Sequence, residues 1–174
     1  MSMDFNQAAD LLKGKTALIT GASQGIGKEI AYRYERAGAD IAFTYISSKD
    51  ITHKLEDELT VRGVKCKGYR VDASDHDATH EMVADVIKHF GRIDVLINNA
   101  GISQRSKCLD TDLAVYKKLL DVDVLGQIAL TKAVLPIMVK QKSGHIVVTA
   151  SVAGKVGVQL RTGYCAAKHA VMMH

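Results

Sequence analysis

The sequence predicts an α/β fold in which helices cover both faces of a parallel sheet, and two observations lead to this expectation. Over its 174 residues, short apolar runs alternate five times with longer segments of helical periodicity. Several of these segments close on a glycine, which is a common C-terminal stop for a helix. Strands that alternate with helices of this length form right-handed crossovers and a doubly wound parallel sheet. We therefore expect one domain over residues 1–174.

The elements follow one another without a low-complexity linker or an internal repeat. The first apolar run, residues 15–20, predicts a strand, and residues 25–38 predict the helix that follows it. The remaining elements are expected, in chain order, as strand 40–45, helix 49–62, strand 64–71, helix 76–90, strand 93–98, helix 111–140, strand 145–150 and a final helix that carries Tyr164 and Lys168. The single proline, Pro136, falls late in the fourth helix, where it is expected to kink or tighten the last turns.

Composition excludes several classes of protein. The net charge of +4 comes from scattered basic residues, and only 5% of residues are aromatic, which argues against a nucleic-acid partner. Three widely spaced cysteines match neither a disulfide framework nor a zinc knuckle, so a reducing, cytoplasmic location is expected. The N-terminal residues show no signal peptide, and Lys132, Pro136 and Lys140 interrupt the longest apolar stretch, so no membrane span is expected.

A metal site is not expected. His76 and His80 have a helical spacing that would suit a metal ion. No third ligand is evident near them, and a solvated helix face is the favoured interpretation.

A glycine-rich turn lies between the first predicted strand and the first predicted helix. Glycines there allow a tight turn and a close approach of the backbone to a pyrophosphate, whose charge then meets the N-terminus of the helix. The alternative is a turn that binds nothing, but its place in the first βαβ unit favours a dinucleotide loop. The residues expected to bind the cofactor here are Gly21, Ser23, Gln24, Gly25, Ile26 and Gly27.

The end of the second strand is expected to select the cofactor. NAD sites usually have an acidic residue about 20 positions beyond the glycines, where it binds the ribose hydroxyls. This chain has no acid there before Asp50, and it presents instead Tyr45, Ser47 and Lys49. Hydroxyls and a cation suit the 2′-phosphate of NADP, although NAD stays possible and Ser47 or Ser48 can equally be a helix N-cap.

Two further strand ends are expected to contact the cofactor. Asp72 and Ala73 follow the third strand, where Asp72 can bind the adenine edge. An alternative role for Asp72, as N-cap of the next helix, suits Ser74 or Asp75 better. After the fourth strand come small residues and side-chain amides that can pack on the cofactor, with a plain Asx turn as the alternative. These residues are Asn98, Asn99, Ala100 and Gly101.

Tyr164 and Lys168 carry the clearest chemical signal. Residues four apart lie on one face of a helix, so the phenol and the ammonium project side by side. A nearby ammonium favours the ionised phenol and makes the hydroxyl a better acid or base near neutral pH. Ser151, at the end of strand 145–150, can reach the same place with a hydroxyl. A solvated lysine beside a half-buried ring would explain the pair alone, but not its combination with a dinucleotide loop.

Taken together, the TGASQGIG, NNAG and YCAAK motifs with Ser151 resemble the classical short-chain dehydrogenase/reductase family. The resemblance implies a Rossmann-type fold with strand order 3-2-1-4-5. The first hundred residues look like bacterial 3-oxoacyl-[acyl-carrier-protein] reductases, and the segment from Ile102 looks closer to animal-type members. The resemblance implies that Tyr164 donates a proton to the substrate oxygen, that Ser151 hydrogen-bonds this oxygen, and that Lys168 binds the nicotinamide ribose. It also implies NADP(H) as cofactor, a small carbonyl or alcohol substrate, and a homo-oligomer.

This sequence departs from the family pattern in two places. The family usually has an asparagine three residues before a glycine of helix four, where this chain has Asp123. A carboxylate near Lys168 would partly cancel the effect of the ammonium on Tyr164, which predicts reduced activity. Family members also continue beyond the last helix, so we expect a C-terminally incomplete fold without the last strands and substrate lid. Its fifth strand would then be a sheet edge prone to association.

The leading function predicted from the sequence is NADP-dependent reduction of a ketone to a secondary alcohol, in the manner of a 3-oxoacyl-[acyl-carrier-protein] reductase. An NAD-dependent polyol or hydroxysteroid dehydrogenase is a second enzymatic interpretation. A nucleotide-binding fragment without catalytic activity is a third, and Asp123 keeps it open.

Overall fold

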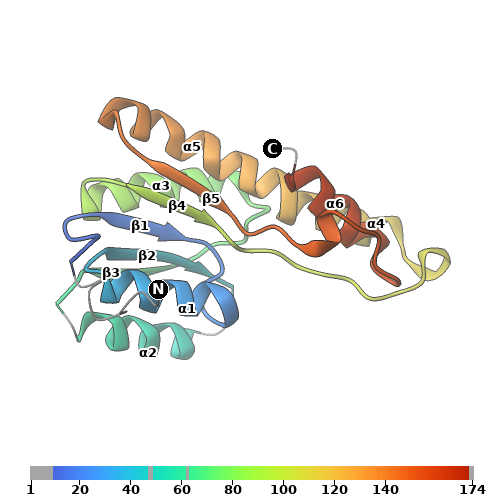
Figure 1. Ribbon diagram of the computed structural model, residues 1–174, viewed down its shortest axis with the longest axis horizontal. Coiled ribbons are helices and arrows are strands. Elements are labelled where there is room, and N and C mark those ends of the chain that lie inside the picture. The colour runs from blue at the N-terminus through green and yellow to red at the C-terminus, as the bar shows by residue number, and fades with distance from the viewer. Residues whose placement is uncertain (1–9, 47–48, 62, 173–174) are drawn as a thin grey trace, which may run out of the picture.

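The computed structural model describes residues 10–46, 49–61 and 63–172, and it shows a five-stranded parallel sheet (Figure 1). The strand order is β3-β2-β1-β4-β5, as the sequence predicts. The strands are β1 (Thr16–Ile19), β2 (Asp40–Tyr45), β3 (Cys66–Arg70), β4 (Val95–Asn98) and β5 (His145–Val148). Both the class of fold and the order of its strands are therefore confirmed.

Helices cover both faces of the sheet. The helices are α1 (Gly25–Arg36), α2 (Lys49–Thr60), α3 (His76–Phe90), α4 (Leu113–Leu120), α5 (Gly126–Gln141) and α6 (Thr162–Met172). One apolar cluster joins α1 and α2 to the sheet through Ala31, Leu55 and Leu59. A second cluster joins α3 and α5 to the opposite face through residues such as Val86 and Val134. Because successive strand residues point to opposite faces, the two clusters share β1, β2 and β4.

The predicted fourth helix is continuous over Leu113–Gln141 but changes its hydrogen bonding in the middle. The segment η3 (Asp121–Leu125) is a π-helix between α4 and α5. A π-helical turn adds a residue within a helix and is frequent at functional sites. It turns Val122 and Asp123 into the protein, where both are buried.

The continuous helix 113–141 has 29 residues and would pass as a membrane span by length and composition alone. Its second half packs on the sheet, since Leu130, Val134 and Met138 are buried in the cluster that α3 also joins. Core helices of α/β domains pass the same test, so the length of this helix is weak evidence for a span. The expectation of no membrane span stays a prediction.

A buried carboxylate joins the starts of β1 and β4. Asp94 accepts hydrogen bonds from the backbone N–H of Thr16 at 3.0 Å and from Arg92 Nε and Nη2 at 2.6 Å each. Lys15 Nζ lies 3.3 Å from the same carboxylate. The side chain of Asp94 is only 6% exposed, and these partners compensate the carboxylate for its loss of contact with water. Its role is not evident from the sequence alone.

Short helical turns and loops build an extension beyond the carboxyl ends of the strands (Figure 1). The 3-10 turns η2 (Cys108–Asp110) and η4 (Val152–Gly154) lie in it, together with α4 and α6. In Figure 1, α6 lies against α4, and it also contacts the π-helical segment η3. Tyr116 of α4 bonds Thr162 at the start of α6 through their hydroxyls, which are 2.7 Å apart. The extension thus places the predicted catalytic helix near the strand ends.

Candidate active site

A cleft of about 800 Å³ lies at the carboxyl ends of the strands and collects residues from distant parts of the chain. In parallel α/β sheets this edge is where ligands bind. The cleft is lined by Gly21, Ser23, Gln24, Gly25, Ile26, Thr44, Tyr45, Ile46, Val71, Ala73, Asn99, Ala100, Gly101, Ile102, Ser103, Val122, Asp123, Thr149, Ala150, Ser151, Tyr164 and Lys168.

The glycine loop has the backbone that a phosphate-binding turn needs. Gly21 has φ +65° and Gly25 has φ +58°, a backbone conformation that residues other than glycine rarely adopt. A Cβ atom on Gly27 would lie 2.5 Å from the carbonyl oxygen of Gly21, so only glycine fits there. Gln24, the N-cap of α1, makes no side-chain capping bond. The first N–H groups of α1 thus stay available to an anion.

The segment after β4 locks the glycine loop in place. Thr20 Oγ1 accepts the backbone N–H groups of Asn99 and Ala100 at 2.9 Å each. Asn99 Nδ2 donates to the carbonyl oxygens of Thr20 at 3.0 Å and Gly21 at 3.3 Å. Asn98 instead points to α5, where its Nδ2 donates to Thr131 Oγ1 at 3.0 Å. Asn99, Ala100 and Gly101 line the cleft, whereas Asn98 is buried beneath it.

Tyr164, Lys168 and Ser151 meet at one end of the cleft. The ammonium of Lys168 lies 5.8 Å from the centre of the Tyr164 ring and donates to the Thr149 carbonyl oxygen at 3.2 Å. Ser151 follows β5, and its Oγ accepts the Ala153 N–H at 3.2 Å, which starts η4. The structure therefore brings the phenol, the ammonium and the hydroxyl to the same cleft as the glycine loop.

Asp123 is buried beside this group. Its Oδ1 accepts the Ile102 N–H at 2.7 Å, and its Oδ2 lies 3.5 Å from Lys168 Nζ. Burial raises the pKa of the Asp123 carboxyl, against the lowering effects of the Ile102 N–H and of Lys168. The side chains of Asp123 and Lys168 are 0% and 5% exposed, so the two charges are paired away from water. The expected proximity of a carboxylate to Lys168 is thus present in the structure.

The end of β2 is described in part. Tyr45 lines the cleft but its ring is mostly buried in the core, 6.3 Å from the ring of Phe43. Ser47 lies outside the described residues, and so does the side chain of Lys49, whose backbone begins α2. Asp123 is the one acidic residue among the described residues that line the cleft. Nothing in this described lining resembles the acid that would bind a ribose diol.

Asp72 lies near the cleft but has other partners. Its Oδ1 accepts hydrogen bonds from the backbone N–H and hydroxyl of Ser74, and Lys118 Nζ lies 3.0 Å from its Oδ2. The N-cap of α3 is Asp75, one of the two residues favoured for that role. Ala73, next to Asp72, lines the cleft directly.

Several residues of the site are not predicted by the sequence patterns. Thr44 Oγ1 accepts the Gly21 N–H at 3.1 Å and so ties the glycine loop to β2. Gln104 Oε1 accepts the Tyr164 N–H at 3.2 Å and so steadies the first turn of α6. No local pattern identifies these two residues, because their partners are 23 and 60 positions away. Thr20 could have been noticed, since it immediately precedes the first glycine.

The residues fit a dinucleotide. The cleft of about 800 Å³ is large enough, its glycine loop turns tightly at Gly21 and Gly25, and the side chain of Gln24 caps none of the first N–H groups of α1. Tyr164 and Lys168 line the same cleft, where they would hold the nicotinamide end of such a cofactor.

Comparisons with known proteins agree with this geometry. Residues 15–174 match the model of a family described as short chain dehydrogenase. The chain is 40% identical over 156 residues to Dehydrogenase/reductase SDR family member 7 of Homo sapiens, covering 88% of this chain and 46% of that protein. It is 38% identical over 164 residues to Dehydrogenase/reductase SDR family member 7B of Rattus norvegicus, covering 91% and 50%. It is 42% identical over 162 residues to Oxidoreductase UcpA of Salmonella typhimurium, covering 92% and 61%. The chain spans about half the length of the curated relatives it matches.

Proposed function

The chain belongs to the short-chain dehydrogenase family, and we propose that it reduces a ketone to a secondary alcohol with NADP(H). The observation that supports this proposal is the single cleft that joins the glycine loop to Tyr164, Lys168 and Ser151. The N-terminal motifs favour a 3-oxoacyl substrate, while the relatives carry the general names dehydrogenase/reductase and oxidoreductase.

Different residues of the protein would bind the cofactor, donate the proton and stabilise the charge that develops on the substrate oxygen. Gly21, Gly27 and the first turn of α1 bind the phosphates, and a nicotinamide bound beyond them supplies the hydride. Tyr164 gives its hydroxyl proton to the substrate oxygen, and the Ser151 hydroxyl donates a hydrogen bond to the same oxygen. Lys168 holds the ribose hydroxyls and provides positive charge next to the phenol.

Replacement of Tyr164 by phenylalanine tests the function. Tyr164→Phe removes only the proton donor, so turnover of a panel of ketones should fall at least about a hundredfold while NADPH still binds. Tyr116→Phe is the matched control, because its hydroxyl bonds Thr162 of the same helix but does not line the cleft. A Tyr164→Phe variant that keeps most of its turnover would contradict the assignment.

The preference for NADP is a proposal of its own. It is supported by the absence of an acid from the described lining at the end of β2 and by the sequence around Ser47 and Lys49. Fluorescence titration should show tighter binding of NADPH than of NADH, and Lys49→Glu should reverse or reduce that preference. Lys65→Glu is a charge-matched control, since Lys65 precedes β3 and does not line the cleft. Equal binding of the two cofactors by the unmodified protein would count against NADP.

We also propose that the protein is a cytoplasmic homo-oligomer with no nucleic-acid partner and no membrane span. The three dispersed cysteines support the location, the lack of a basic run argues against a nucleic-acid partner, and the family resemblance supports the oligomer. Sedimentation of the purified protein tests the oligomer, and cell fractionation tests the location. A monomer, or recovery with membranes, would contradict it.

A further inference from the structure

Arg161 lies beside Tyr164 although it does not itself line the cleft, and the sequence patterns assign it no role. It immediately precedes α6, and its guanidinium carbon lies 5.8 Å from the centre of the Tyr164 ring. The Lys168 ammonium lies at the same distance from that centre. Two cations therefore lie close to the ring of the residue that we propose as proton donor.

The two cations differ in how their charge is balanced. Lys168 pairs with Asp123 at 3.5 Å, and these two are the only charged residues among the described residues lining the cleft. Arg161, by contrast, makes no ion pair with any residue that the structure describes. The unbalanced positive charge beside Tyr164 thus belongs to Arg161.

The guanidinium is held at the edge of the cleft. Its Nη1 donates to the hydroxyl of Ser103, and Ser103 is one of the residues that line the cleft. The backbone of Arg161 is fixed on both sides, since its N–H donates to Val158 O at 3.2 Å and its carbonyl accepts the Cys165 N–H at 2.8 Å. A half-buried arginine fixed in this way loses little freedom when it binds a ligand.

The residue before Arg161 has a strained backbone. Leu160 has φ +63°, a left-handed conformation that residues with a Cβ atom rarely adopt. The Ser106 N–H holds it by donating to the Leu160 carbonyl oxygen at 2.9 Å. Strain of this kind persists where the surrounding structure over-determines it, and it concentrates at functional sites. Here it fixes the direction in which the chain enters α6.

We propose that Arg161 binds a carboxylate of the substrate, so that the ketone reduced is a short 2-oxo or 3-oxo acid. This inference rests on the proposed reductase function, and it assigns a free oxo acid as substrate in place of a 3-oxoacyl thioester. A guanidinium offers parallel N–H groups that match the two oxygens of a carboxylate, and such charge-assisted pairs are the stronger hydrogen bonds of proteins. A ketone that lies beneath Tyr164 with its acid group towards Ser103 would meet both groups. An acyl thioester or a methyl ester lacks the charge that Arg161 would bind.

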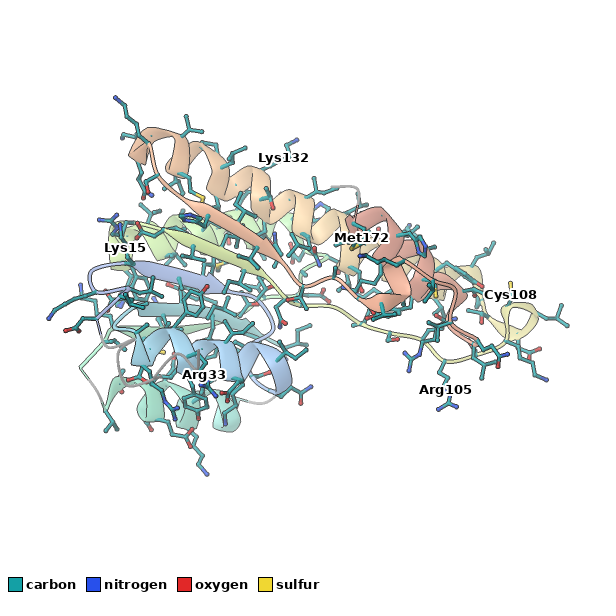
Figure 2. All side chains as sticks on the ribbon, in the orientation of Figure 1. Lys15, Arg33, Arg105, Cys108, Lys132 and Met172 are labelled. Carbon is teal, nitrogen blue, oxygen red and sulfur yellow. The ribbon has the colours of Figure 1, made fainter. Side chains whose placement is uncertain are left out.

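The experiment compares acids with their uncharged esters. Reduction of 2-oxobutanoate and 3-oxobutanoate is measured beside their methyl esters, for the unmodified protein and for Arg161→Met and Arg161→Lys. Arg105→Met is the matched control, because Arg105 follows the cleft-lining Ser103 closely in sequence but projects away from the molecule (Figure 2). Calorimetric binding of 2-oxobutanoate to the protein saturated with NADPH is the second readout.

The inference predicts that the unmodified protein prefers the acids. Arg161→Met should lower kcat/KM for them about tenfold or more, with the esters changed less than about twofold. Arg161→Lys should give an intermediate loss, and Arg105→Met no change in the acid-to-ester ratio. A ratio that is the same in the unmodified protein and in Arg161→Met would overturn the inference.

Failure of this inference differs from failure of the proposed function. If esters and neutral ketones are reduced while the acids are not, the reductase stands and the carboxylate site is wrong. If no ketone is reduced, the proposed function is wrong, and calorimetry then decides the site. Binding of 2-oxobutanoate that Arg161→Met abolishes would still support it, and binding that is absent or unaffected by this variant would overturn it.

Discussion

Gly27 offers a sharp test of the cofactor site, because the structure leaves no room for a side chain there. A methyl group at this position would lie 2.5 Å from the Gly21 carbonyl oxygen, 2.6 Å from Asn99 Nδ2 and 3.0 Å from Ala22 Cα. Two of these three atoms are backbone atoms, which cannot rotate away as the end of a flexible side chain can. Gly27→Ala must therefore displace the glycine loop or push Asn99 out of place.

The size of the effect follows from what the displaced groups hold. Overpacking of a well-packed site costs about 1–3 kcal/mol, and loss of the two Asn99 Nδ2 hydrogen bonds costs about 0.5–1.5 kcal/mol each. Because part of this strain is relieved by movement, we expect unfolding to become easier by about 2–4 kcal/mol. The loop that moves is also the one that would bind phosphate, so NADPH affinity should fall at least about tenfold.

Two measurements and one control separate binding from stability. Urea unfolding gives the free energy of unfolding, and fluorescence titration gives the affinity for NADPH. Gly91→Ala is the control, since Gly91 has a positive φ of 80° and ends α3 away from the cleft, and a Cβ on it would have no atom within 4 Å. It should lose about 1–2 kcal/mol of stability through backbone strain and keep its affinity. Normal NADPH binding by Gly27→Ala would refute the proposed phosphate site.

Two further predictions concern buried carboxylates. Burial raises the pKa of Asp123, so the folded protein keeps this proton longer than the unfolded chain and loses stability as pH rises through that interval. Asp123→Asn removes this loss and frees Lys168 from its partner. It should therefore match or exceed normal turnover, and by urea unfolding its stability relative to the unmodified protein should rise as pH increases above the ordinary pKa of a carboxyl group. A difference that does not change with pH, or a large loss of turnover, would contradict this account. Burial alone would raise the pKa of Asp94, but hydrogen bonds from Arg92 and the Thr16 N–H outweigh it and hold the pKa below its ordinary value. The ionised Asp94 carboxylate thus stabilises the fold above the ordinary carboxyl pKa, and this stabilisation is lost as pH falls. Asp94→Asn should therefore lower the free energy of unfolding by about 2–4 kcal/mol at pH 7 and by less near pH 3, measured by urea unfolding at both pH values. An equal cost at both would show that the charge of Asp94 is not what stabilises the protein.

Much of the fold could be predicted because hydrophobic periodicity reports local backbone geometry. Residues 40–45 and 76–90 are a strand and a helix with the predicted bounds. Other strands are shorter than predicted, as with β1 at Thr16–Ile19, because the flanking Lys15 and Thr20 belong to the adjoining loops and lie outside the paired register. The predicted helix 111–140 was right in extent, but its apolar pattern did not reveal the π-helical turn at Asp121–Leu125.

The sequence by itself determined the class of fold and the motifs of the site, since periodicity and motif spacing depend on residues close together in the chain. The order of the strands followed from the family that these motifs resemble. Only the tertiary structure decided which distant groups meet at the site. The fold paired Asp123 with Lys168 across 45 positions and placed Arg161 beside the ring of Tyr164. It also brought Thr44 and Asn99 within hydrogen-bonding distance of the glycine loop. The physical reason is that a buried charge or an unpaired N–H must find a partner, and packing rather than sequence spacing decides which partner is within reach.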